Sequence, residues 1–152
     1  MHELLDKYRG RSVLITGGLG FIGSNLARRL AEIGGVKVYI VDALVPGLGG
    51  NPHNIHDIRD LVTVYNANLS SDWVINHLVV GMDYIFNLAG SVSHLDSMLN
   101  PLMDMDLNCV GQVRLLEACR SFNPTAKIVF TSTRQVPHKP KPMQLRYLSI
   151  PL

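Results

Sequence analysis

The sequence carries little charge, and neither sign is concentrated in one region. Charged residues make up 17% of the 152 positions, and the formal net charge at pH 7 is +2 with neutral histidines. The 14 Lys and Arg residues are scattered and form no basic stripe interleaved with aromatic residues. Such a stripe is typical of proteins that bind nucleic acids, so we expect no nucleic-acid partner.

A long hydrophobic run is also missing. No apolar stretch of the sequence approaches the ~20 residues that a membrane-spanning helix needs. Residues 1–7 are too acidic, and have too few apolar residues in a row, for a secretory signal peptide. We therefore expect no membrane partner and a cytoplasmic location.

Cysteine is rare. Cys109 and Cys119 fall within one predicted helix, ten residues apart. At ~1.5 Å per residue they are separated by ~15 Å along the helix axis. A disulfide needs Cα atoms within ~7 Å, so we interpret both cysteines as small, buried apolar residues.

Clusters of metal-binding or nucleophilic residue types are sparse as well. His53, His56 and Asp57 have the types of half a metal site, but no third cluster accompanies them, and we predict no metal. Residues 91–96 contain Ser, His and Asp, the types of a catalytic triad. No nucleophile-elbow pattern surrounds these serines, which disfavours hydrolase chemistry.

What the chain does contain is an alternation of short apolar runs and amphipathic segments. Five runs rich in β-branched residues are almost continuously apolar, as parallel strands covered on both faces are. The predicted strands are residues 12–16, 37–41, 62–65, 84–87 and 127–131. Strands that alternate with helices predict an α/β fold with a Rossmann-type, doubly wound parallel sheet of strand order 3-2-1-4-5, truncated after the fifth strand.

Helical patterns fill the intervals between these strands. Residues 21–33 place Ile22, Leu26, Leu30 and Ile33 on one apolar stripe. A short helix is predicted over residues 71–79. The longest predicted helix begins at Pro101 behind an Asn100 cap and ends near Phe122, before Asn123 and Pro124.

A run of glycines follows the first predicted strand. Gly17, Gly20 and Gly23 form the pattern G-x-x-G-x-x-G at the start of a helix. In a dinucleotide site the first glycine allows a tight turn, the second admits a pyrophosphate and the third lets the helix pack on the strand. Asp42, at the end of the second strand, stands where a carboxylate binds ribose hydroxyls. The sequence thus favours dinucleotide binding over a plain structural turn.

Five segments resemble, in order, the extended short-chain dehydrogenase/reductase family. Within it they are most similar to the NAD-dependent epimerase/dehydratase branch, which acts on nucleotide sugars. The segments are TGGLGFIGS, VD, NLAG, LNCVGQVRLLEACR and VFTSTRQV, and the resemblance covers residues 10–136. It implies NAD as cofactor, a nucleotide-sugar substrate and the homodimer that is usual in the family.

The resemblance also implies which residues hold NAD. The glycine motif would bind the pyrophosphate, Asp42 the adenosine ribose, and Asn108 would lie near the nicotinamide. Asn68 replaces the family's usual Asp near the adenine amino group. The implied cofactor-binding residues are Gly17, Gly20, Phe21, Ile22, Gly23, Asp42, Asn68, Leu88, Ala89, Gly90 and Asn108. We expect residues 53–55 to border the adenosine, and residues 47–50 to form a flexible turn.

The catalytic part of the family pattern is incomplete. Thr133 stands where the family has a Ser or Thr that hydrogen-bonds the sugar hydroxyl being oxidised. The family then uses Tyr-x-x-x-Lys, in which the tyrosine is the base and the lysine lowers its pKa. That motif is absent, since the last tyrosine, Tyr147, is followed four residues later by Pro151.

The last residues depart from the family. Pro137 and His138 replace the expected Tyr-Gly, and four prolines from Pro137 onward oppose a helix or a central strand. We therefore divide the chain into an NAD-binding domain, residues 1–136, and an irregular non-family tail, residues 137–152. A frameshift near codon 137 and an ordinary divergent end both remain open.

Two functional classes follow. The first is the cofactor-binding half of an NAD-dependent nucleotide-sugar epimerase or dehydratase that is not active alone. The second is a non-catalytic NAD-binding module or a truncated remnant.

Overall fold

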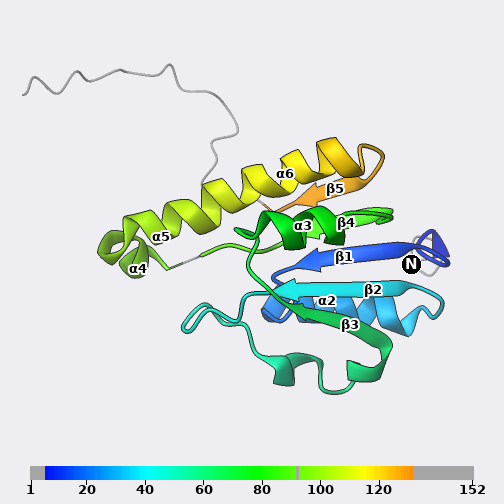
Figure 1. Ribbon diagram of the computed structural model, residues 1–152. Helices are drawn as coiled ribbons and strands as arrows, with labels where there is room; N and C mark the ends of the chain where they lie inside the picture. Colours follow the sequence, from blue (N-terminus) through cyan, green and yellow to red (C-terminus); the bar gives the residue numbers. More distant parts are fainter. Residues whose placement is uncertain (1–5, 92, 132–152) are drawn as a thin grey trace, which may run out of the picture.

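The fold is built on a five-stranded parallel sheet of order β3-β2-β1-β4-β5, shown in Figure 1. The computed structural model describes residues 6–91 and 93–131. The strands are β1 (Ser12–Thr16), β2 (Lys37–Asp42), β3 (Val62–Asn66), β4 (Tyr84–Asn87) and β5 (Lys127–Phe130). Strand order and parallel pairing are confirmed, and each strand ends within one residue of its predicted boundary.

The register of the sheet aligns the carboxyl ends of β1, β2 and β4. Thr16, the last residue of β1, pairs with Val41 of β2 on one side and with Asn87 of β4 on the other. After β3 the chain returns past β1 to form β4 on its other side. This reversal of strand order creates a crevice between β1 and β4, where ligands bind in sheets of this type.

Helices cover both faces of the sheet (Figure 1). The α-helices are α2 (Phe21–Glu32), α3 (Asp72–Leu78), α4 (His94–Leu99), α5 (Pro101–Met105) and α6 (Gly111–Phe122). Two 3₁₀ turns, η1 (Pro52–Ile55) and η2 (Arg59–Leu61), precede β3, and a π-helical turn, η3 (Asp106–Val110), joins α5 to α6. In the described part of the chain, no helix has the length and apolarity needed to cross a membrane.

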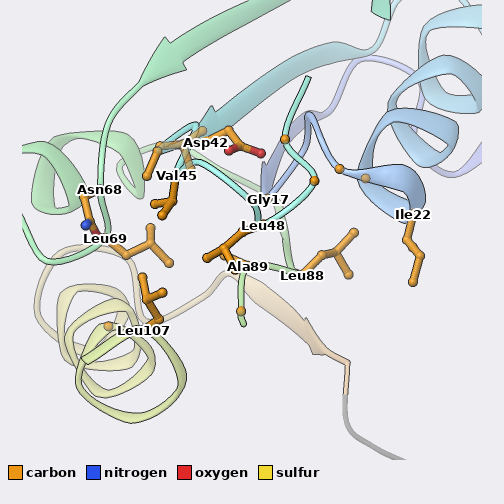
Figure 2. A pocket seen from close by; sticks show the side chains of 18 of the residues that line it. Gly17, Ile22, Asp42, Val45, Leu48, Asn68, Leu69, Leu88, Ala89 and Leu107 are labelled. Atoms are coloured by element: carbon orange, nitrogen blue, oxygen red, sulfur yellow. The ribbon is translucent and has the colours of Figure 1, made fainter. Parts of the chain in front are cut away.

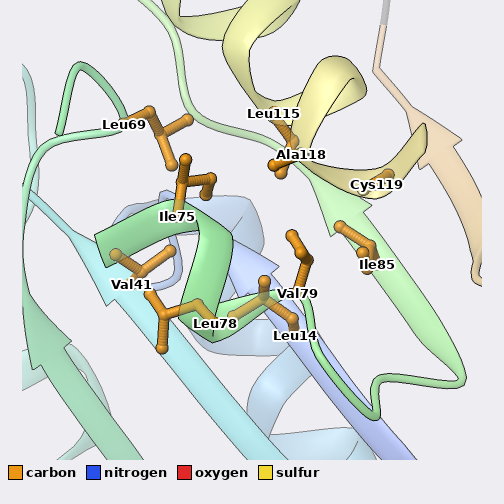
Figure 3. Close-up of a cluster of buried hydrophobic side chains, with 10 residues drawn as sticks. All are labelled: Leu14, Val41, Leu69, Ile75, Leu78, Val79, Ile85, Leu115, Ala118 and Cys119. Atoms are coloured by element: carbon orange, nitrogen blue, oxygen red, sulfur yellow. The ribbon is translucent and has the colours of Figure 1, made fainter. Parts of the chain in front are cut away.

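Two apolar clusters flank the sheet, because successive side chains of a strand point to opposite faces. On one face Leu14 of β1 packs with Ile85 of β4 and with Leu115 of α6 (Figure 3). On the other face Val13 and Ile15 of the same strand pack against α2. The central strands β1, β2 and β4 are therefore covered on both sides, which explains their nearly continuous apolar sequences. The edge strands β3 and β5 are mostly exposed, so the prediction of cover on both faces is wrong for them.

The predicted stripe of α2 is confirmed except at its first residue, since Leu30 is buried and Leu26 and Ile33 pack against the core. The residues of α2 that are buried are Gly23, Ser24, Ala27 and Leu30. Ile22, which was expected in the core, is 62% exposed. Close contact between Gly23 and the turn after β1 rotates small residues toward the sheet and leaves Ile22 at the edge of the crevice.

The long predicted helix is also more complex than expected. It consists of α5, the π-helical η3 and α6, preceded by the unpredicted α4. The predicted cap is confirmed, since Asn100 Oδ1 accepts a hydrogen bond from Met103 N. Both cysteines are free. Cys119 is buried as predicted, whereas Cys109 is exposed because it lies on η3, none of whose residues is buried.

Leu115 and Leu116 give a direct test of how α6 packs. Replacing the fully buried Leu115 with Ala is expected to lower the free energy of unfolding by about 2–5 kcal/mol, since a cavity is left between α6 and the sheet. Leu116 is 51% exposed, and its replacement with Ala should change stability by no more than about 0.5 kcal/mol. Denaturant unfolding followed by circular dichroism measures both, and equal losses would contradict the described packing.

Candidate functional site

The turn between β1 and α2 brings backbone segments together without side chains between them. Gly17 has a φ of +65°, and a Cβ atom there would lie 2.9 Å from Cα and N of Ala89, at the end of β4. A Cβ atom on Gly23 would lie 2.4 Å from the Gly17 carbonyl oxygen. Both positions therefore require glycine. The turn presents bare backbone to the crevice.

Asp42 ties this turn to the end of β2. One carboxylate oxygen accepts a hydrogen bond from Leu19 N within the glycine turn, and the other accepts one from Leu44 N, both at 3.0 Å. Gly50 approaches the same carboxylate, since a Cβ atom there would lie 2.8 Å from Oδ1. The loop of residues 47–50, expected to be a plain turn, therefore packs over Asp42.

These elements enclose a groove of about 380 Å³ beyond the carboxyl ends of β1, β2 and β4, seen in Figure 2. Ten of the eleven predicted cofactor-binding residues line it, and Asn108 is the exception. The ten are Gly17, Gly20, Phe21, Ile22, Gly23, Asp42, Asn68, Leu88, Ala89 and Gly90. Their roles toward a cofactor remain predictions.

The rest of the groove wall is mainly apolar and was missed by sequence reasoning. Val45 and Leu48 of the loop after β2, Leu69 after β3 and Leu107 of η3 approach the groove (Figure 2). Val45 and Leu69 follow the ends of β2 and β3, a position that could have indicated them. Leu48 lies in the glycine-rich run of residues 47–50, which was interpreted only as a turn, and no sequence signal marks Leu107. Among the described lining residues, Asp42 alone carries a charged side chain.

Asn68 has a defined orientation at the edge of the groove. Its Oδ1 accepts a hydrogen bond from the backbone N–H of Ser70 at 3.0 Å. The Ser70 hydroxyl lies 3.1 Å from the same oxygen, but its single hydrogen has a nearer acceptor in the Asp106 carboxylate, at 2.8 Å. The backbone donor identifies the Asn68 atom as the oxygen. Toward a bound base Asn68 therefore offers N–H donors, whereas an aspartate would offer an acceptor.

Asn108 lies behind Gly90, outside the groove. Its Oδ1 accepts a hydrogen bond from Ser91 N at 2.8 Å, and its Nδ2 donates to Ser91 O and to Asp104 Oδ1, both at 3.0 Å. A Cβ atom on Gly90 would lie 2.9 Å from Asn108 Oδ1. In this structure Asn108 holds the segment after β4, and its predicted place near a nicotinamide stays a prediction.

Residues 53–55 do not line the groove, contrary to expectation. Ile55 is buried in the core, and Asn54 Nδ2 donates to the Leu19 carbonyl at 2.8 Å, supporting the glycine turn from outside. Arg28 of α2 fixes this segment by donating to Asn54 O at 2.9 Å and to Asp57. The hydrogen bond from Arg28 lowers the pKa of the exposed Asp57 carboxyl to about 2.

The predicted absence of a metal and the predicted role of Thr133 both stay predictions. Among the described residues no group of three His, Cys, Asp or Glu side chains could hold a metal ion. Thr133, the predicted catalytic residue, and residues 137–152 lie outside the described residues.

Comparison with known proteins gives the class of this chain. The sequence model of the NAD dependent epimerase/dehydratase family matches residues 13–150. The chain therefore belongs to this family, whose cofactor is NAD, and its Rossmann-type fold agrees with that of structurally similar members.

Two of the relatives are named as nucleotide-sugar epimerases, and a third is a crystal structure with NAD+ bound. The chain is 36% identical over 126 residues to CDP-paratose 2-epimerase of Salmonella typhi, covering 82% of this chain and 37% of the relative. It is 33% identical over 121 residues to a putative UDP-glucose 4-epimerase of Methanocaldococcus jannaschii, and the match covers 80% of this chain and 37% of the relative. The crystal structure of the Bordetella bronchiseptica enzyme WbmF in complex with NAD+ matches with a TM-score of 0.71 and 32% identity. This match covers 82% of the present chain and 36% of the WbmF chain. The chain thus spans little more than a third of the length of these relatives.

Two glycines of the motif should respond differently to alanine. Gly23→Ala is expected to lower the free energy of unfolding by about 1–3 kcal/mol, because the new Cβ overlaps the Gly17 carbonyl and Gly18 Cα. Gly20 has a φ of −74°, and a Cβ there would meet only the Gly17 oxygen, at 3.3 Å. Gly20→Ala should therefore stay within about 0.5 kcal/mol of the unchanged chain. Thermal unfolding of both variants measures the difference, and a Gly20→Ala loss as large as that of Gly23→Ala would refute this geometry.

Proposed function

We propose that this chain forms the NAD-binding half of a nucleotide-sugar epimerase or dehydratase. The observation that carries the proposal is the single groove around which ten residues expected to bind NAD are gathered. Membership in an NAD-dependent family supports it, as does the set of groups available. A helix start flanked by glycines suits a pyrophosphate, a carboxylate suits ribose hydroxyls, and apolar walls suit an adenine ring.

The residues of the groove fit the pyrophosphate, the adenosine ribose and the adenine base of NAD. The N–H groups at the start of α2 would hold the pyrophosphate, because Gly17, Gly20 and Gly23 let it approach the backbone. Asp42 would accept hydrogen bonds from the adenosine ribose. Asn68 would donate to the base from the rim of the groove. Bound NAD would supply a hydride acceptor for the transient oxidation of a sugar carbon.

Catalysis needs groups beyond those described. By family resemblance Thr133 would hydrogen-bond the sugar hydroxyl, and a Tyr-x-x-x-Lys tyrosine would remove its proton. The 152 residues contain no such motif. We therefore propose that this chain binds NAD and does not by itself convert a nucleotide sugar.

The remaining parts of the proposal concern assembly and organisation. We propose a homodimer through the helical segment from α5 to α6, on which Leu102, Met105, Val113 and Leu116 are exposed. The division into a domain of residues 1–136 and a tail of residues 137–152 is part of the same proposal. The cytoplasmic location stays a prediction.

Cofactor choice should depend on Asp42. NAD is expected to bind more tightly than NADP by about 1–3 kcal/mol, since the 2′-phosphate of NADP would meet the carboxylate with no cation in the described groove wall to neutralise it. Asp42→Asn should weaken NAD binding and reduce the discrimination against NADP. Isothermal titration calorimetry on the 152-residue chain measures both affinities. Tighter binding of NADP by the correctly folded, unchanged chain would overturn the assignment.

Activity is the second test. The 152-residue chain, supplied with NAD, should show no turnover of UDP-, GDP-, dTDP- or CDP-sugars, because general-base catalysis is typically worth about 10²–10⁴ in rate and positioning by further residues can contribute more. Chromatography of the products measures turnover, on a preparation whose NAD binding calorimetry has established. Turnover that Thr133→Ala abolishes would show that the catalytic base was misplaced.

A further inference from the structure

We propose that Gln112 is a positioning residue that fixes two walls of the cofactor groove relative to each other. It lies in the first turn of α6, between the segment after β4 and the π-helical η3. Those two segments supply Ala89 and Leu107 to the groove wall. The inference rests on the proposed function, because the groove it shapes is the one assigned to NAD.

The side-chain amide of Gln112 is bonded to both walls. Its Nε2 donates to the carbonyl oxygen of Ala89 at 3.0 Å and to that of Leu107 at 3.2 Å. Its Oε1 accepts a hydrogen bond from Nδ2 of Asn87, the last residue of β4. One amide thus joins the end of the sheet, the segment after β4 and η3.

The hydroxyl of Thr16, the last residue of β1, fixes which groups donate and which accept in these hydrogen bonds. Thr16 Oγ1 accepts from the backbone N–H groups of Leu88 and Ala89, both at 3.1 Å, so its own hydrogen points to Asn87 Oδ1 at 2.8 Å. Asn87 is 2% exposed, and its Nδ2 is then the donor to Gln112. Gln112 can only accept from Asn87 and donate to the two carbonyls. Neither the Asn87 amide nor the Gln112 amide can be flipped without breaking a hydrogen bond of this network.

The Gln112 amide also supports the π-helical turn. Within η3 the helix is widened, and Gly111 N–H bonds to Asp106 O, five residues back. The Leu107 carbonyl inside this turn accepts the Gln112 side chain. A side chain bonded into the helix ladder is a common cause of such a bulge, and single π turns are frequent at functional sites.

Gln112 and Asn108 act on the same segment from one face of the helix. They are four positions apart, which places them next to each other. Gln112 holds the Ala89 carbonyl, and Asn108 holds both backbone groups of Ser91. By contrast, α6 packs on the core through Leu115, Ala118 and Cys119. Loss of the Gln112 amide is therefore expected to disturb the groove more than the core.

Gln112→Glu tests this role, because its effect depends on pH. The ionised carboxylate has no proton for the carbonyls of Ala89 and Leu107, so NAD should bind at least roughly tenfold more weakly than to the unchanged chain at about pH 8. The protonated acid can accept from Asn87 and donate to one carbonyl, so affinity should recover near pH 5. The carbonyls and partial burial should raise the pKa of this carboxyl above its ordinary value of about 4.3.

The other charged groups around Gln112 are shared by every variant compared. Asp104 is bonded by Asn108, Asp106 by the Ser70 hydroxyl, and Arg114 donates to the Ser70 carbonyl. Asp42 lies in the groove itself. The ratio of affinities between variant and unchanged chain at each pH removes their contribution.

A matched control places the same carboxylate on the surface, away from the groove and from the proposed interface on α5 to α6. Val80, after α3, is 54% exposed and does not line the groove, so Val80→Glu should bind NAD as the unchanged chain does at both pH values. Gln112→Met keeps the size of the side chain without hydrogen bonds or charge. It should fold, with NAD binding roughly tenfold weaker at both pH values.

Amide exchange measured by NMR gives a readout that needs no cofactor. The Ser91 N–H, bonded to Asn108 Oδ1, should lose protection in Gln112→Glu at pH 8 relative to the unchanged chain and regain it at pH 5. If the unchanged chain does not bind NAD, the proposed function fails, and the exchange data decide the role of Gln112. Unchanged binding and protection in Gln112→Met, or no recovery of Gln112→Glu at pH 5, would overturn the inference.

Discussion

The close approach of bare backbone at the end of β1 is the constraint on which the site depends. A Cβ atom on Gly17 would lie 2.9 Å from Ala89, and one on Gly23 would lie 2.4 Å from the Gly17 carbonyl. Strand β1, helix α2 and the segment after β4 therefore meet without side chains between them. This geometry orients the start of α2 toward the groove and leaves room there for a phosphate group.

The turn is held by the buried side chain of Leu19 and by polar groups from neighbouring segments that bind its backbone. The Asp42 carboxylate binds Leu19 N, and the Asn54 amide binds the Leu19 carbonyl from the other side. The Thr16 hydroxyl holds the first two N–H groups after β4. Each bond uses a backbone group next to the groove, and the groove is thereby shaped before any ligand enters it.

Helix α6 contacts the groove walls with its first turn, the sheet with its inner face and solvent with its outer face. Its first turn carries Gln112, which reaches the groove walls through hydrogen bonds. Its inner face packs Leu115 against the sheet, and its outer face exposes Val113 and Leu116. The π-helical turn η3 before α6 contains an extra residue. This residue rotates the side chains of η3, which face the groove, relative to those of α6, which face the core.

The strands, the glycine turn and Asp42 could be predicted from the sequence, because apolar periodicity and turn chemistry are local properties. The strand order followed from the rules for connecting parallel strands. The burial of Gly23 and the exposure of Ile22 on α2 depend on how closely the helix approaches the sheet, and the period of an apolar stripe does not contain that distance. The same holds for Gln112, whose bond to Ala89 joins residues 23 positions apart. Hydrogen bonds between distant segments leave no periodic pattern in the sequence, and the fold alone brings their partners together.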